Sequence, residues 1–278
     1  MIIWLASYPK SGNTWVRSFL SAYYYSSDGN FSFELLDKIK QFPNKEFFNK
    51  KIESVDDASK EWLNAQKEII KKDKLCFLKT HNCYGSFKGR HFTSPEYTKG
   101  AVYIVRDPRN ILSSLMNHFS IDEENAYKMI TNVYRNLKND NEDYSTYSFI
   151  SSWNNNYNSW KVSTKIKTIF VKYEDLENNK HDTFRSIINF INGLFFENDK
   201  INNDKLNKAI ETTNFDILQK KEELEGFSEA IFSKKDGRKK RFFNLGKKNQ
   251  YSKLLKSKTI KDVENIFFKE MSDLNYID

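Results

Sequence analysis

The sequence contains only two cysteines, Cys76 and Cys83, and no Cys/His cluster with the spacing of a zinc site. Two cysteines cannot build a disulfide scaffold, so we expect both to be reduced residues of a cytosolic protein. No apolar run approaches the roughly 20 residues that a membrane-spanning helix needs, and the N-terminus lacks the charged and apolar regions of a signal peptide. These absences predict a cytoplasmic protein without a membrane span.

The usual phosphate-loop spelling, Gly-x-x-x-x-Gly-Lys-Ser/Thr, is also absent. Lys10 precedes Gly12, the single glycine of its loop, where the usual spelling puts lysine after a second glycine. We find no Mg²⁺ ligands in the sequence that would accompany such a loop. An ordinary ATPase or GTPase is therefore disfavoured, and a nucleotide-dependent kinase remains only as an alternative.

Aromatic residues and positive charge are abundant. Aromatic residues make up 15% of the 278 residues, which indicates a packed interior despite a mean hydropathy of -0.73. The formal net charge of +8 favours anionic ligands. We predict a single domain over residues 1–278, with helical or loop insertions near 26–72 and 120–148.

Short apolar runs alternate with helical periodicity along the chain. The runs at 2–6, 75–81, 101–105 and 167–172 each lead into a turn and a helical pattern, which favours right-handed strand-helix-strand units. The sequence therefore predicts an α/β fold with a parallel β-sheet flanked by helices. A further helix is expected over 56–72, and helical spacing extends from Tyr127 to Leu137.

The turn after the first run has the composition of a phosphate-binding loop. Backbone N–H groups at the start of the following helix face such a loop, and its positive dipole end attracts anions. Ser11 and Thr14 add hydroxyl groups, and Lys10 adds a point charge. A structural turn without a ligand is the simpler alternative.

Polar side chains also follow the next two predicted strands. His81 ends the run at 75–81, where its ordinary pKa of about 6.5 suits proton transfer, although a histidine in this position is often structural. We rank His91, His118 and His181 below it. Arg106 follows the strand at 101–105 and precedes a helix that begins near Pro108, so its guanidinium can bind a second phosphate or pair with a carboxylate.

The segment Tyr8-Pro9-Lys10-Ser11-Gly12-Asn13-Thr14-Trp15 resembles the 5′-phosphosulfate loop of the sulfotransferase family, usually spelled Tyr-Pro-Lys-Ser-Gly-Thr-Thr-Trp. Only Asn13 departs from that spelling. Lys79-Thr80-His81 is similar to the Lys-Thr-His of soluble sulfotransferases, and Arg106 and Ser114 keep the family's eight-residue spacing. The resemblance implies a P-loop-like sulfotransferase fold.

The same resemblance implies transfer of a sulfuryl group from 3′-phosphoadenosine 5′-phosphosulfate (PAPS) to a hydroxyl or amine of a small-molecule or carbohydrate acceptor. His81 would be the general base, Lys10 would stabilise the leaving phosphate, and Lys79 would assist at the sulfuryl oxygens. This chemistry requires no metal. The residues that would bind PAPS are Lys10, Ser11, Gly12, Asn13, Thr14, Trp15, Arg106, Ser114, Tyr173, Phe215, Arg241 and Gly246.

The strongest local charge lies in the segment 234–248. Asn244-Leu245-Gly246 stands where the family has an Arg-Lys-Gly loop, so this part of the resemblance is degraded. The lost charge could be replaced by neighbouring basic residues, namely Arg238, Lys239, Lys240, Arg241, Lys247 and Lys248. The alternative is a non-catalytic nucleic-acid-binding protein that uses this basic segment, which we consider less favoured.

Overall fold

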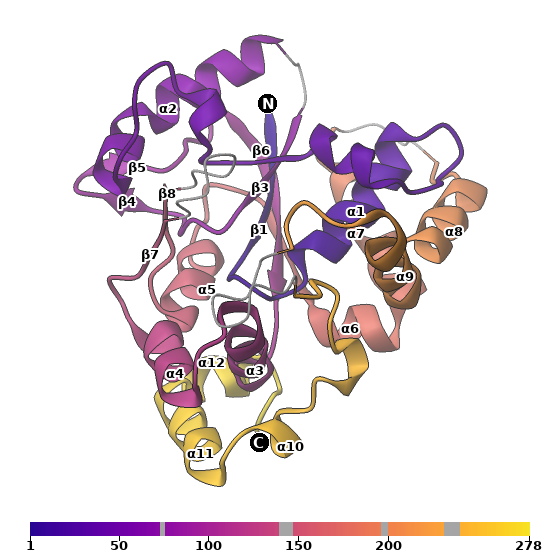
Figure 1. The fold of residues 1–278 in the computed structure, drawn as a ribbon. Coiled ribbons are helices and arrows are strands. Elements are labelled where there is room, and N and C mark those ends of the chain that lie inside the picture. Colours follow the sequence, from indigo (N-terminus) through magenta and orange to yellow (C-terminus); the bar gives the residue numbers. More distant parts are fainter. Residues whose placement is uncertain (73–75, 139–146, 196–199, 231–239) are drawn as a thin grey trace.

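The computed structural model describes residues 1–72, 76–138, 147–195, 200–230 and 240–278 (Figure 1). Within these ranges, five parallel strands form a sheet in the order β2-β3-β1-β6-β9. The strands are β2 (Lys40–Gln41), β3 (Cys76–Thr80), β1 (Ile2–Ser7), β6 (Thr98–Val105) and β9 (Thr168–Lys172). The predicted α/β class with a parallel sheet is confirmed.

The sheet is covered on both faces because successive residues of a strand point to opposite sides. Ile3 and Leu5 pack into one apolar core, and Ile2 and Trp4 pack into the other. The first core is covered by α1 (Asn13–Tyr25), α6 (Tyr173–Asn178), α7 (Lys180–Gly193), α8 (Asn203–Thr212) and α9 (Phe215–Glu225). The second is covered by α2 (Val55–Lys72), α3 (Pro108–Phe119), α4 (Glu123–Thr131), α5 (Trp153–Lys161), α11 (Ser257–Ile266) and α12 (Phe268–Asp273).

Smaller elements complete the described chain. Two antiparallel pairs lie beside the central sheet: β4 (Ser86–Phe87) with β5 (Arg90–His91), and β7 (Asn136–Lys138) with β8 (Tyr147–Phe149). A short helix, α10 (Tyr251–Leu254), and 3₁₀ turns at Phe33–Lys38, Lys45–Phe47 and Gly246–Lys248 occupy the connections. In the part of the chain that the structure describes, every helix is too short or too polar to cross a lipid bilayer.

The predicted helical run from Tyr127 to Leu137 is wrong in its second half. The helix α4 ends at Thr131, and Leu137 lies in the strand β7. Asn132 has an extended backbone, and its side-chain oxygen accepts a hydrogen bond from the N–H of Tyr134 at 2.9 Å. This local turn competes with the helical hydrogen bonds and ends the helix.

The register of the sheet brings the carboxyl ends of its central strands to one level. Ala6 of β1 pairs with Thr80 of β3 and with Tyr103 of β6. Ser7 and His81 therefore leave neighbouring strands side by side, and the loop before α1 begins at this edge. Ligands of open α/β sheets bind beyond such carboxyl ends.

Candidate active site

A cavity of about 300 Å³ opens beyond the carboxyl ends of β1, β3 and β6. Most residues that the sequence suggested for the site line this cavity. They are Lys10, Gly12, Asn13, Thr14, Trp15, Lys79, His81, Arg106, Ser114, Tyr173, Phe215 and Gly246. Ser11 and Arg241 are not among the lining residues.

The loop before α1 is held in its conformation by a glycine and an asparagine. Gly12 has φ +96°, a left-handed value that suits glycine, and a Cβ atom there would lie 2.4 Å from the Tyr173 ring. The Asn13 amide donates hydrogen bonds to the Leu5 carbonyl at 2.9 Å and to the Ser7 hydroxyl at 3.1 Å. Asn13 therefore fastens the loop to the end of β1.

His81 is oriented by the strand next to its own. Its Nδ1 lies 2.8 Å from the Ser7 carbonyl oxygen. A carbonyl can only accept, so Nδ1 carries the hydrogen and Nε2 keeps a lone pair. Burial lowers the pKa of His81 to about 3, and the nearby positive charge of Lys79 acts in the same direction. The imidazole is therefore neutral at pH 7 and can accept a proton, but as a weaker base than the ordinary pKa of about 6.5 had suggested.

Two lysines share the cavity with His81: Lys79, which is buried, and Lys10, which is partly buried. Burial, together with the positive charges of Lys79 and Arg106, lowers the pKa of Lys10 to about 8. Burial also lowers the pKa of Lys79, against the attraction of Glu229. Ammonium groups that are largely removed from water interact strongly with an anion, because less water screens them.

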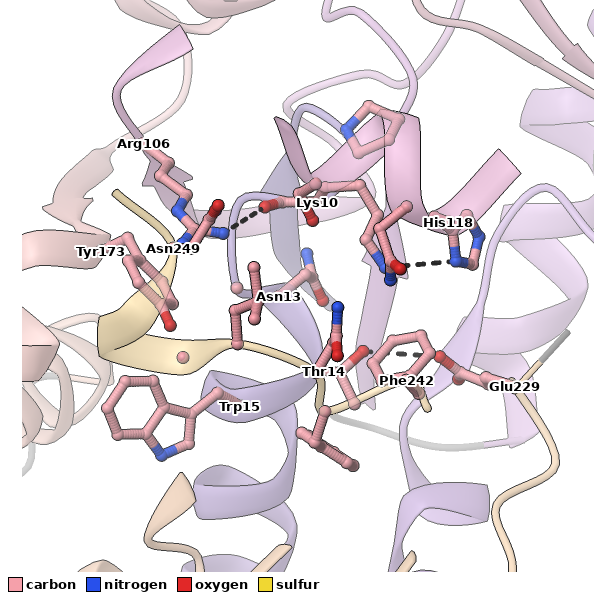
Figure 2. Close-up of a pocket in the computed structure, with 18 of the residues that line it drawn as sticks. Lys10, Asn13, Thr14, Trp15, Arg106, His118, Tyr173, Glu229, Phe242 and Asn249 are labelled. Atoms are coloured by element: carbon pink, nitrogen blue, oxygen red, sulfur yellow. Dashed lines mark hydrogen bonds between the residues drawn. The ribbon is translucent and has the colours of Figure 1, made fainter. Parts of the chain in front are cut away.

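Arg106 lies at the other end of the cavity from His118 (Figure 2). Its Nη1 donates to the Lys10 carbonyl at 3.1 Å, and its guanidinium carbon lies 3.9 Å from the centre of the Tyr173 ring. Arg106 Nε is buried and has no hydrogen-bond partner among the described residues. A buried donor without a partner is a group that a bound anion would satisfy.

Aromatic rings surround this end of the cavity. Trp15 meets Tyr173 edge to face, with ring centres 5.8 Å apart. Phe215 packs so closely on Gly246 that a Cβ atom at Gly246 would lie 2.6 Å from its ring. Flat apolar faces next to a cationic donor suit a nucleobase joined to a phosphate.

Arg241 does not fit the role that the resemblance implied. Its side chain is 56% exposed and pairs with Glu223 instead of entering the cavity. Lys240 donates to the Asn117 carbonyl at 2.5 Å. Arg238 and Lys239 lie outside the described residues, and the lining of the cavity continues from Phe242 to Gly246.

Sequence reasoning missed several cavity residues. His118 Nδ1 lies 3.4 Å from Lys10 Nζ, although the sequence ranked this histidine below His81. Glu229 enters the cavity from the segment after α9, and Asn249 accepts from the buried Ser113 hydroxyl at 2.7 Å. No local pattern marks these residues, because their neighbours in space come from distant parts of the chain.

Figure 2 places Arg106, Tyr173, Asn249 and Trp15 at one end of the cavity, with His118, Phe242 and Glu229 at the other.

The parallel sheet, the loop at the N-terminus of α1 and the cationic cavity beyond the strand ends together define an α/β nucleotide-binding protein. The sulfotransferase domain family matches residues 2–275, and the chain belongs to this family. The luciferin sulfotransferase of Photinus pyralis is 22% identical over 223 residues. That alignment covers 77% of this chain and 56% of the length of the relative.

Two solved structures that contain PAP share the fold. A retinol dehydratase in complex with androsterone and the inactive cofactor PAP superposes with a TM-score of 0.62 at 14% identity, over 98% of this chain and 81% of that one. A mouse sulfotransferase, SULT7A1, complexed with PAP superposes with a TM-score of 0.56 at 15% identity, over 98% and 84% of the two chains.

Proposed function

We propose that this protein transfers a sulfuryl group from PAPS to a hydroxyl or amine of a small-molecule or carbohydrate acceptor. The observation that best supports this proposal is the orientation of His81, whose Nδ1–H donates to the Ser7 carbonyl. Its ring lines a cavity that is also lined by Lys10 and Lys79. A neutral imidazole beside desolvated ammonium groups can accept a proton from an acceptor while the lysines bind an anionic donor.

The donor would lie along the length of the cavity. Thr14 and the N–H groups at the start of α1 would hold the 5′-phosphate, and Arg106 with Ser114 would hold the 3′-phosphate. The unpartnered Arg106 Nε supports this placement. Trp15, Tyr173 and Phe215 would surround the adenine.

His81 Nε2 would remove the acceptor proton as the acceptor oxygen or nitrogen forms a bond to sulfur. The bond between sulfur and the bridging phosphate oxygen would break, and its electron pair would leave with adenosine 3′,5′-bisphosphate (PAP). Lys10 would stabilise that leaving phosphate, and Lys79 would contact the sulfuryl oxygens. As in phosphoryl transfer, catalysis would come from positioning and charge stabilisation.

The acceptor would enter at the end of the cavity that contains His81, where Gln41, His118 and Phe119 line the wall. The structural relative named above binds androsterone, and a structure of a retinol dehydratase contains retinol and PAP. Both ligands are small molecules, which supports an acceptor of similar size.

Titration calorimetry with PAP tests the donor site. We expect wild-type protein to bind PAP, and Lys10→Ala and Arg106→Ala to weaken binding by about tenfold or more, because each removes a charged contact to a phosphate. Lys161→Ala is the matched control, since Lys161 is exposed and pairs with Asp273 at 2.9 Å.

An acceptor screen with PAPS then tests the chemistry. We expect His81→Ala to lower the transfer rate by about 10²–10⁴ while PAP affinity stays within error of wild type. Absence of PAP binding, together with salt-sensitive binding of an oligonucleotide, would overturn the proposal and favour the basic segment as the functional element.

A further inference from the structure

We infer that Glu229 determines donor specificity, because its carboxylate occupies the cationic position that the phosphosulfate oxygens would take and must be displaced when the donor binds. The inference rests on the proposed function. It predicts that free inorganic anions are excluded and that PAPS, which gains further contacts elsewhere in the cavity, is accepted.

Glu229 is bound by the same groups that would bind the donor. Its carboxylate accepts from Lys79 Nζ at 3.2 Å and from the Thr14 hydroxyl at 3.4 Å. It also forms an ion pair with Arg17 of α1, and its side chain is only 8% exposed. Figure 2 shows Glu229 directed at Thr14.

A carboxylate and a sulfate oxygen compete for the same donors because both are anionic acceptors. Burial opposes the ionisation of Glu229, but the charges of Lys79 and Arg17 hold its pKa well below the ordinary range. The group is therefore ionised in the ligand-free protein. Two anions at contact distance repel each other strongly in a desolvated site, so Glu229 and a phosphosulfate cannot share Lys79 and Thr14.

The position of Glu229 in the chain allows the side chain to leave. The helix α9 ends at Glu225, and Gly226 follows with φ +77°. Glu229 lies beyond this cap, outside regular secondary structure. Its displacement from Lys79 and Thr14 therefore breaks no helical hydrogen bond.

Because Glu229 must be displaced, the site favours ligands that also reach its far end, where Arg106, Trp15 and Tyr173 lie. Inorganic sulfate would only replace one anionic acceptor for Lys79 and Thr14 by another. PAPS would add contacts to Arg106 and to the aromatic rings, and these can offset the loss of the Glu229 contacts. Adenosine 3′-monophosphate would reach that far end without displacing Glu229 at all.

The test compares wild type with Glu229→Gln, which removes the charge and keeps the shape. Glu223→Gln is the matched control, because it makes the same charge change at an acid that pairs with exposed Arg241 outside the cavity lining. Calorimetry without acceptor uses PAPS, adenosine 3′-monophosphate and inorganic sulfate as ligands. We expect Glu229→Gln to bind PAPS and sulfate about tenfold more tightly or better, while its affinity for adenosine 3′-monophosphate is unchanged.

A second measurement needs no variant and covers the case in which Glu229→Gln is unstable. Carbodiimide labelling of wild-type carboxylates, read by mass spectrometry of peptides, should leave Glu229 protected without ligand and label it several-fold more with PAPS. Adenosine 3′-monophosphate should leave the protection intact.

The outcomes separate this inference from the function on which it rests. Failure of both wild type and Glu229→Gln to bind PAPS would overturn the proposed function. Binding of PAPS by wild type, with unchanged or weaker binding by Glu229→Gln or with Glu229 still protected, would overturn this inference alone and make Glu229 a residue that positions Lys79.

Discussion

Substitution of Gly12 by alanine tests whether the loop before α1 and the Tyr173 ring form one unit. The change introduces a Cβ atom 2.4 Å from Tyr173 Cδ2, at a residue with φ +96°. The ring has little space to retreat, since Tyr173 is 5% exposed and lies between Trp15 and the Arg106 guanidinium. The substitution therefore combines backbone strain with a steric conflict.

The two costs can be separated. A non-glycine residue in left-handed conformation costs about 1–2 kcal/mol, and forcing an extra carbon into a packed region costs about 1–3 kcal/mol. Gly12→Ala should therefore lower the free energy of unfolding by about 2–5 kcal/mol. Gly89 is the matched control, because it has φ +78° but a Cβ atom there would meet nothing within 4 Å. Gly89→Ala should therefore lower the free energy of unfolding only by the backbone strain, about 1–2 kcal/mol.

The assay is urea unfolding of both variants, followed by PAP calorimetry on the folded proteins. Gly12→Ala should bind PAP about tenfold more weakly, because displacement of Tyr173 disturbs the Arg106 guanidinium and a loss of about 1.4 kcal/mol is a factor of ten. Gly89→Ala should bind PAP like wild type. Equal stability of the two variants, with unchanged PAP affinity in Gly12→Ala, would refute the reasoning.

Two further predictions concern Lys10 and Asn13. Lys10 must be protonated to stabilise a leaving phosphate, and its pKa is lowered to about 8, so kcat/KM should fall as pH rises through about 8. Lys10→Arg keeps its charge at that pH and should lose this alkaline decline; a decline that persists in the arginine variant would contradict the assignment. Asn13→Ala leaves the Leu5 carbonyl without its side-chain donor and should lower the free energy of unfolding by about 1–3 kcal/mol in urea, whereas unchanged stability would show that the loop is fastened by other contacts.

The parts of the candidate site that could be predicted lie in contiguous segments. The run from Ile2 to Trp15 contains a strand, a loop and the start of a helix, and local hydrophobic pattern and turn chemistry indicate all three. Arg106 and Ser114 were found in the same way, since Pro108 at the first turn and the Asp107 side chain, which accepts from Arg109 N, mark the start of α3.

Periodicity was less reliable where a single side chain changes the backbone. The spacing from Tyr127 to Leu137 is helical, yet Asn132 forms a local turn that ends α4. Charge was also an uncertain guide, because Arg241 is basic but pairs with Glu223 at the surface. The end of α4 and the pairing of Arg241 do not follow from composition. Both depend on which hydrogen-bond partner lies near in the folded chain.

The sequence by itself determined the parallel α/β architecture and the strand-loop-helix turn before α1, because both follow from patterns among residues close in the chain. Only the tertiary structure brought Glu229 to Lys79 and Thr14, and His118 to Lys10. These pairs are separated by more than one hundred residues, so no local pattern relates them. The register of β1 and β3 and the packing of the segment after α9 decide which charges meet in the cavity. Burial in that cavity, and to a lesser extent those charges, lower the pKa values of Lys10 and His81 on which the proposed chemistry depends.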